Sequence, residues 1–388
     1  MSREPHRVQR IDRLGMLLSF VGALALTLLP LVVFKANRIV PGEPRALLDL
    51  VPAAALALYF ALAVAAGVAV YIQSPRVRLL VALVGIAALA VAVASAADIL
   101  TPAGNRVVRV APGAGFWIVL IALGLLATDA LTRLRPGPVL RVATLAVFLA
   151  ATVAALGSGF FDDLSIMREY AVNATRFADE ARRHLLLALG SLAAAVIVAL
   201  PLGVLCHRQP RLRHAVLGAL NVVQTIPSIA LFGILMAPLA AMALAFPALA
   251  ALGLSGIGAA PAAIALFLYS LLPIVGNTVV GLGRVSPAAI DAARGMGLTD
   301  GQVLRQIELP LALPTILTGI RIVLVQNIGM VTIAALIGGG GFGAFVFQGI
   351  GQTAIDLVLL GAIPTVVLAF SASVVLDALT DLTRRVPR

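Results

Sequence analysis

Residues 79–97 read LLVALVGIAALAVAVASAA, a run of nineteen residues without a charged side chain. A helix of about 20 apolar residues matches the thickness of the hydrocarbon core of a bilayer. Water cannot bond to the backbone in that core, so a spanning segment must satisfy its own N–H and C=O groups, as a helix does. The run therefore predicts a transmembrane helix.

Ten long apolar runs, this one included, follow one another along the chain. They cover residues 14–34, 50–71, 79–97, 113–132, 142–158, 185–206, 215–240, 257–281, 315–338 and 355–376. Of the 388 residues, 61% are hydrophobic and 12% are charged, which is more apolar than a water-soluble protein of this size can hide in a core. We therefore expect an all-α integral membrane protein with about ten transmembrane helices.

The basic residues indicate the orientation of the chain. Lys and Arg outnumber Asp and Glu by 28 to 17, but they form short clusters between the apolar runs, which argues against a nucleic-acid partner. With the N-terminus inside, the cytoplasmic segments carry about twice as many basic residues as the outer ones, beginning with Arg3, Arg7, Arg10 and Arg13. We expect a multi-pass membrane protein with both termini in the cytoplasm.

The segment 159–184 divides the ten runs into two groups of five. It is longer and more polar than the other connections, and Ile166, Tyr170 and Phe177 recur in it at helical spacing. Such a pattern is typical of an amphipathic helix at the membrane surface. We therefore expect a five-span N-terminal extension at 1–158, a periplasmic linker at 159–184 and a five-span domain at 185–380.

Between the eighth and ninth runs, residues 285–310 read VSPAAIDAARGMGLTDGQVLRQIELP. Ser286 and Pro287 suit the first positions of a short helix, because serine can cap a helix and proline is tolerated in its first turn. Gly295 or Gly297 suits the end of that helix. Taken alone, this chemistry also fits a well-capped surface loop.

A second short helix should follow the glycines. Thr299 and Gln302 have the spacing of a capping box, and we expect the helix to stop at Leu309 and Pro310. Two short helices joined by a glycine hinge can lie across the membrane face and fit the groove of another protein. The segment holds no set of nucleophile, base or metal ligands, so we expect no enzymatic activity.

The order of residues in this segment is distinctive. The triplet 291–293 (Asp-Ala-Ala) is followed after three residues by Gly297, and after nine more by Ile307, Glu308, Leu309 and Pro310. This pattern resembles the cytoplasmic signature of permease subunits of ATP-binding cassette importers, with aspartate in place of glutamate. The resemblance implies that the segment is a coupling helix, held in a cleft of the ATPase subunit. The implied ATPase-coupling residues are Asp291, Ala292, Ala293, Gly297, Ile307, Leu309 and Pro310.

The resemblance extends over residues 184–380. The stretches PLG (201–203), QTIPS (224–228), LPIVGNT (272–278) and LIGGGGFG (336–343) look like those of permeases that import glycine betaine, choline and carnitine as osmoprotectants. The resemblance implies a C-terminal, MetI-like permease core of five helices. It also implies three partners: a cytoplasmic ATPase dimer that binds Mg-ATP, a periplasmic substrate-binding protein, and a second permease subunit, either identical or paralogous. We expect the chain itself to hold no cofactor.

Polar residues and prolines inside the apolar runs are candidates for the translocation pathway. Proline removes a backbone hydrogen bond and kinks a helix, and a kinked membrane helix needs neighbours that satisfy its backbone. For Gln224 and Asn277, hydrogen bonding between helices is the alternative explanation. The candidate pathway residues are Gln224, Pro227, Ser228, Pro273, Asn277 and Asn327.

Other functions fit the sequence less well. A secondary transporter driven by protons or sodium needs ionisable residues deep in its spans, and these runs have no central Asp, Glu or His. Asp377 and Asp381 lie at a span end without a histidine nearby, so we expect solvated carboxylates rather than a metal site. The glycine run at 338–343 lacks the following Lys-Ser/Thr of a phosphate loop and suits a close helix approach or a bent connection. A permease for another small solute, such as an amino acid, remains the main alternative.

Overall fold

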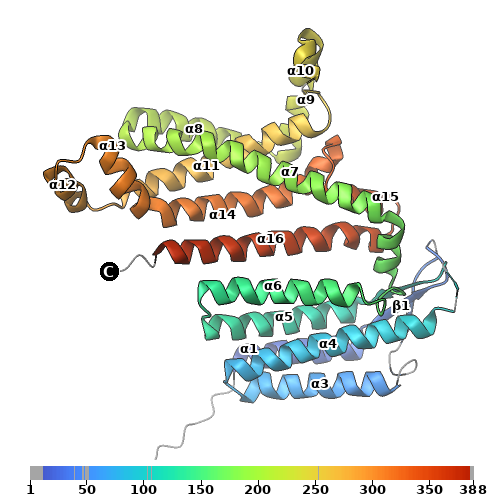
Figure 1. Ribbon diagram of the computed structural model, residues 1–388. Helices are drawn as coiled ribbons and strands as arrows, with labels where there is room; N and C mark the ends of the chain where they lie inside the picture. The colour runs from blue at the N-terminus through green and yellow to red at the C-terminus, as the bar shows by residue number, and fades with distance from the viewer. Residues whose placement is uncertain are drawn as a thin grey trace, which may run out of the picture. The chain divides into compact units, whose positions relative to one another are not determined.

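The structure is a computed structural model that describes residues 12–38, 40–45, 48, 52–102, 104–105, 107–251 and 253–384 (Figure 1). Arg3, Arg7 and Arg10 of the N-terminal basic cluster lie outside these residues. The chain forms two compact units. Unit 1 comprises Met1–Gly137 and Phe148–Ala171, and unit 2 comprises Pro138–Val147 and Val172–Arg388.

Unit 1 consists of apolar helices and a small sheet. Its helices are α1 (Arg13–Leu28), α3 (Pro52–Tyr71), α4 (Pro75–Leu100), α5 (Ala114–Leu134) and the second half of α6 (Pro138–Leu156). Strands β1 (Val32–Lys35), β2 (Glu43–Arg45) and β3 (Arg109–Pro112) form an antiparallel sheet in the order β2-β1-β3. The core is aliphatic and includes Leu58, Leu89 and Val93.

The first span is shorter than the expected range of 14–34. Helix α1 ends at Leu28, and Leu29 is extended with φ −119° and ψ 145°. The cause is Pro30, because a proline disfavours the helical conformation of the residue before it. The apolar residues after Pro30 form strand β1, so the sequence analysis was wrong to include them in the span, and it did not foresee the sheet.

Unit 2 is built around α11 (Ala259–Gly283) and α14 (Leu309–Ala334), which contact each other along their length, and α16 (Ile355–Arg384) packs on α14. The other elements are α7 (Ser165–Arg208), α8 (Pro210–Thr225), α9 (Ser228–Ala245), α10 (Pro247–Ala251), α12 (Pro287–Gly295), α13 (Asp300–Val303), the π-helix η1 (Leu304–Glu308), the 3-10 helix η2 (Ala335–Ile337) and α15 (Gly343–Gly351). Within this unit, α12 and α13 lie at one end and α15 lies at the other (Figure 1).

Helix α7 differs from the expected linker. The residues of 159–184 that recur at helical spacing are helical, but they do not form a separate element, since one helix of 44 residues runs from Ser165 to Arg208. No glycine or proline occurs between residues 165 and 189, so nothing in the sequence ends the helix there.

The residues expected to form one span at 215–240 belong to two helices. Helix α8 ends at Thr225, Ile226 is extended with φ −71° and ψ 126°, and α9 begins at Ser228. Pro227 therefore breaks the run instead of kinking a continuous helix, because it forces Ile226 out of the helical conformation.

The remaining spans agree with the expectation. Eight helices of the described chain are long and apolar enough to cross a membrane, and two shorter apolar helices cover Arg13–Leu28 and Ala55–Tyr71. The all-α membrane fold with about ten apolar helices is confirmed, with the small sheet as an addition.

Candidate functional site

The expected two-helix segment is present at one end of unit 2. Helix α12 begins after Ser286 with Pro287 in its first turn, and its last residue is Gly295. The amide of Leu298 donates to the carbonyl of Ala293 (3.2 Å), and the amide of Gly297 donates to that of Arg294 (2.9 Å). These two bonds are a Schellman motif with Gly297 in the left-handed conformation, at φ +87°. The backbone thus requires glycine at the central position of the signature.

The second helix starts as expected and ends differently. Thr299 and Gln302 form the capping box, and the Thr299 amide donates to Gln302 Oε1 (2.8 Å). The helix does not end at Leu309 and Pro310, because α13 continues through η1 directly into α14. The amide of Leu309 donates five residues back to Leu304. This wider turn precedes the proline that cannot donate, and it lets the helix continue where the sequence analysis expected a stop.

The signature residues divide into an outer and an inner set. Asp291, Ala292 and Gly297 are exposed, and the neighbouring Met296 is 71% exposed. Ala293 is buried, and only 1% of its surface is exposed. The short helix therefore offers small and apolar side chains to solvent, together with one carboxylate, while its other face packs on the rest of the segment.

An ion pair that the sequence analysis missed joins this segment to α7. Arg208 Nη2 lies 2.7 Å from Glu308 Oε2, and the Glu308 side chain is only 3% exposed. Leu309 packs beside the pair, in a cluster that includes Val204 of α7 and Ile316 of α14. No local signal could have revealed the pair, since its members are 100 residues apart.

Two of the candidate pathway residues meet at one backbone group. Pro273 lies inside α11 and has no N–H, so the carbonyl of Tyr269, four residues earlier, lacks its helical donor. Gln224 Nε2 of α8 donates to that carbonyl at 2.8 Å. The Tyr269 hydroxyl in turn donates to the carbonyl of Ile226, at the break between α8 and α9. The carbonyl that Pro273 leaves without its helical donor is therefore satisfied by a side chain of another helix.

The other pathway candidates occupy different surroundings. Asn327 is fully buried, and its Nδ2 donates to the hydroxyls of Ser270 (3.0 Å) and Ser191 (3.2 Å). Asn277 Nδ2 donates to the carbonyl of Pro273 at 2.8 Å. Pro227 and Ser228 lie at the start of α9 and are exposed and half-buried respectively.

The glycine run is a bent connection held by side chains of α7. Gly338, Gly340 and Gly341 have φ between +78° and +84°, and a Cβ on Gly343 would lie 1.9 Å from the Thr332 carbonyl oxygen. The run therefore provides both the bend and the close approach expected of it. Glu180 Oε2 accepts from the Gly341 amide at 2.6 Å.

A buried histidine completes this connection. His184 Nδ1 accepts from the Phe342 amide (3.2 Å), and Nε2 is 3.0 Å from the Ile328 carbonyl, so the neutral imidazole with its proton on Nε2 satisfies both bonds. His184 precedes the apolar run at 185–206, yet it is fully buried and links α7, α14 and the glycine run.

Asp377 and Asp381 are paired, not simply solvated as expected. Arg141 of α6 donates to both carboxylates, and Arg321 of α14 donates to Asp377. The four side chains are each between a quarter and two fifths exposed. They therefore form a partly hydrated ionic network that ties the first turns of α6 to α16.

Comparison with known families agrees with this geometry. The family described as "Binding-protein-dependent transport system inner membrane component" matches residues 189–385, which include residues 285–310, referred to below as the coupling segment, and the glycine run. This chain belongs to that family. Residues 12–167 of the chain match a second family, described as "ABC transporter permease YehY, N-terminal domain". The extension ahead of the permease core is thus itself a recurring domain.

Several relatives of this family member are similar over the permease core. The osmoprotectant import permease protein OsmW of Salmonella typhimurium is 43% identical and covers 51% of this chain and 86% of its own length. The carnitine transport permease protein OpuCB of Listeria monocytogenes is 38% identical and covers 48% of this chain and 78% of its own length. The choline transport system permease protein OpuBD of Bacillus subtilis is 37% identical and covers 54% of this chain and 87% of its own length. Among solved structures, the inward-facing MetNI methionine ABC transporter is similar with a TM-score of 0.46 and 21% sequence identity. The match covers 54% of this chain and 96% of that chain. The family assignment rests on sequence and not on this structure.

Proposed function

We propose that this permease carries glycine betaine, choline, carnitine or a related quaternary ammonium compound across the inner membrane, driven by a separate ATPase. The observation that carries the proposal is the coupling segment, whose exposed helix α12 ends in the glycine-dependent turn at Gly297. The names of the relatives supply the substrate class.

The chain's residues suggest how ATP-driven movement reaches the membrane. An ATPase groove would hold the exposed face of α12, with Asp291 beside it, and would move the segment as one body. Glu308 then transmits the movement to α7 through Arg208, and the unbroken helix from α13 through η1 carries it into α14. Because the Glu308 carboxylate is buried, moving α7 away from the segment would leave that charge without its partner.

The remaining parts of the proposal come from the family. An ATPase dimer would bind Mg-ATP on the cytoplasmic side, where the coupling segment and both termini of this chain lie. A periplasmic binding protein would deliver the cargo, and a second permease subunit would complete the pathway. Quaternary ammonium groups are recognised by aromatic rings through cation–π attraction, so selection of the cargo belongs mainly to the binding protein.

The test is uptake of labelled glycine betaine by cells that lack their own betaine transporters and express this permease with its ATPase and binding protein. Gly297→Ala should sharply reduce uptake, because alanine in the left-handed conformation costs about 1 kcal/mol or more in the coupling turn. Gly295→Ala is the matched control, since Gly295 is helical and a Cβ there meets nothing within 4 Å.

Each outcome decides a different part of the proposal. Uptake that depends on ATP and on Gly297 supports both the coupling role and the substrate class. ATP hydrolysis without betaine uptake means that the cargo is another small solute, such as an amino acid. Failure of the ATPase to associate with the chain would overturn the coupling role of α12.

A further inference from the structure

Unit 1 contains an apolar groove of about 430 Å³ between α1, α3 and α5. Seven of its sixteen lining residues are Gly or Ala, and the small side chains are what leave the space open. Its few polar atoms include the hydroxyls of Ser19 and Thr27, and both donate to carbonyls of α1 itself. The wall therefore presents hydrocarbon to whatever fills the groove.

The groove is closed at one end and open further along. A Cβ on Gly15 would lie 2.0 Å from the Ala69 carbonyl oxygen, so the backbones of α1 and α3 touch there. A Cβ on Gly22 would meet nothing within 4 Å. The two helices therefore separate over seven residues, or about 10 Å along the helix axis.

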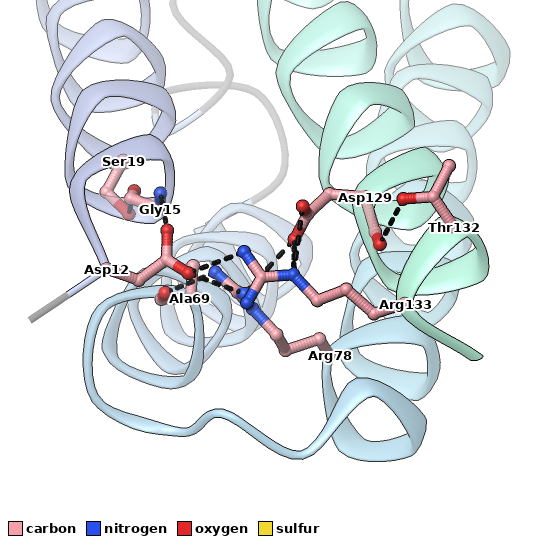
Figure 2. Close-up of polar contacts among 8 residues, drawn as sticks. All are labelled: Asp12, Gly15, Ser19, Ala69, Arg78, Asp129, Thr132 and Arg133. Atoms are coloured by element: carbon pink, nitrogen blue, oxygen red, sulfur yellow. Dashed lines mark hydrogen bonds and ion pairs between the residues drawn. The ribbon is translucent and has the colours of Figure 1, made fainter. Parts of the chain in front are cut away.

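An ionic network lies at the closed end (Figure 2). Arg78 of α4 is fully buried, and its guanidinium donates to Asp12 (2.9 Å), to Asp129 (3.1 Å) and to the same Ala69 carbonyl (2.7 Å). Arg133 of α5 donates to both carboxylates. The groove thus runs from a charged cluster into the apolar interior of the helices.

The charged end has an excess of cations. Five arginines and two aspartates lie at these ends of α1, α4 and α5 among the described residues. The two carboxylates are already bound by Arg78 and Arg133. Arg13 and Arg76 are exposed, and neither makes a hydrogen bond or ion pair with the described part of the chain. An anion that approached this end would therefore meet two cations that no carboxylate of the described residues neutralises.

We propose that the groove binds one phospholipid, with an acyl chain between α1 and α3 and an anionic headgroup at Arg13 and Arg76. Basic pockets between transmembrane helices are the sites that anionic lipid headgroups use. We favour a lipid over a helix from a partner, because exposed cations at the closed end suit an anionic headgroup and the wall of the groove offers hydrocarbon to an acyl chain.

The test counts lipids retained by the full chain, purified in detergent, by native mass spectrometry during titration with dioleoyl phosphatidylglycerol. Gly22→Leu fills the groove and should weaken retention of one lipid at least tenfold. Gly124→Leu is the matched control, because that glycine of α5 also has nothing within 4 Å of a Cβ but does not line the groove. It should bind phosphatidylglycerol like the unmodified chain.

The headgroup is tested separately. The double variant Arg13→Gln and Arg76→Gln should lower the affinity for phosphatidylglycerol towards that for dioleoyl phosphatidylcholine, which has the same chains and no net charge. Equal retention by the Gly22→Leu and Gly124→Leu variants would overturn the site. Equal affinity of the unmodified chain for the two lipids would overturn the anionic headgroup.

Discussion

At the scale of single residues, Pro273 acts through the carbonyl that it leaves without a helical donor. Gln224 takes the place of the amide that Pro273 lacks, and the Tyr269 hydroxyl serves the carbonyl of Ile226 next to Pro227. The sequence identified Gln224 and Pro273 separately as polar and kinking residues. It could not pair them, because the pairing depends on how α8 packs against α11.

We therefore predict that Gln224→Leu destabilises the permease core. The Tyr269 carbonyl would be left without a donor in an apolar environment, which costs about 1–3 kcal/mol. Thermal unfolding of the purified chain in detergent measures the loss. Gln326→Leu is the control, because that amide contacts only the sulfur of Met330, at 3.5 Å. Equal unfolding temperatures for the two variants would contradict the role of Gln224.

Asp12 gives unit 1 a defined response to pH. Burial alone would raise its pKa, but hydrogen bonds from Arg78, the Gly15 amide and Arg133, with the charge of Arg78, lower the pKa well below its usual value. A carboxyl group with a lowered pKa stabilises the folded state above its unfolded pKa, near 4, and loses that contribution as the pH falls towards the folded pKa.

The stability difference between the unmodified chain and Asp12→Asn should accordingly stay constant from pH 5 to 8 and shrink below about pH 4. Thermal unfolding of both proteins across this range measures it. A difference that changes between pH 6 and 8 would show that another group controls the network.

At the scale of elements, the sequence predicted what short-range chemistry decides. The capping box of Thr299 and the glycine turn at Gly297 follow from residues within one turn of each other, and both are present. The break at Pro227 and the end of α1 before Pro30 follow from the same local rule, which outweighs the continuous apolar pattern. Contacts between distant elements, such as Glu180 with Gly341, left no pattern in the sequence.

The Arg208–Glu308 pair between α7 and the coupling segment should behave as one unit. Arg208→Gln would leave Glu308 buried without its partner, and because the Arg208 side chain is 37% exposed, solvent limits the loss to about 1–3 kcal/mol. The exchanged pair Arg208→Glu with Glu308→Arg should recover part of the stability and of ATP-driven uptake. A double-mutant cycle by thermal unfolding checks this, and strictly additive losses would refute coupling between the two residues.

At the scale of the whole molecule, the change from unit 1 to unit 2 after residue 171 falls inside the segment 159–184, but residues 138–147 also belong to unit 2. The first turns of α6 belong to unit 2, where Arg141 binds Asp377 and Asp381, and α7 begins in unit 1 and continues into unit 2. The pattern of polar and apolar residues locates the polar segment. The compact units depend on packing and ion pairs that this pattern does not reveal.

The ionic network therefore predicts where the permease core can be separated from its extension. A fragment of residues 138–388 keeps Arg141 and should unfold at a higher temperature than a fragment of 165–388, which leaves Asp381 without that partner. Arg141→Gln in the longer fragment should remove most of the difference. If the two fragments are equally stable, the network does not hold α6 on α16.

The length of α7 has a mechanical consequence. Its 44 residues give a rod of about 66 Å, roughly twice the thickness of the bilayer's hydrocarbon core. From Arg208 at the coupling segment to Glu180 at the glycine run is about 42 Å along this rod. If the rod stays stiff, a tilt of about 5° at one end displaces the other by about 4 Å, roughly the length of a side chain. Because Pro201 lies within this stretch, bending of α7 at the proline sets how much of such a tilt at the coupling segment reaches the glycine run.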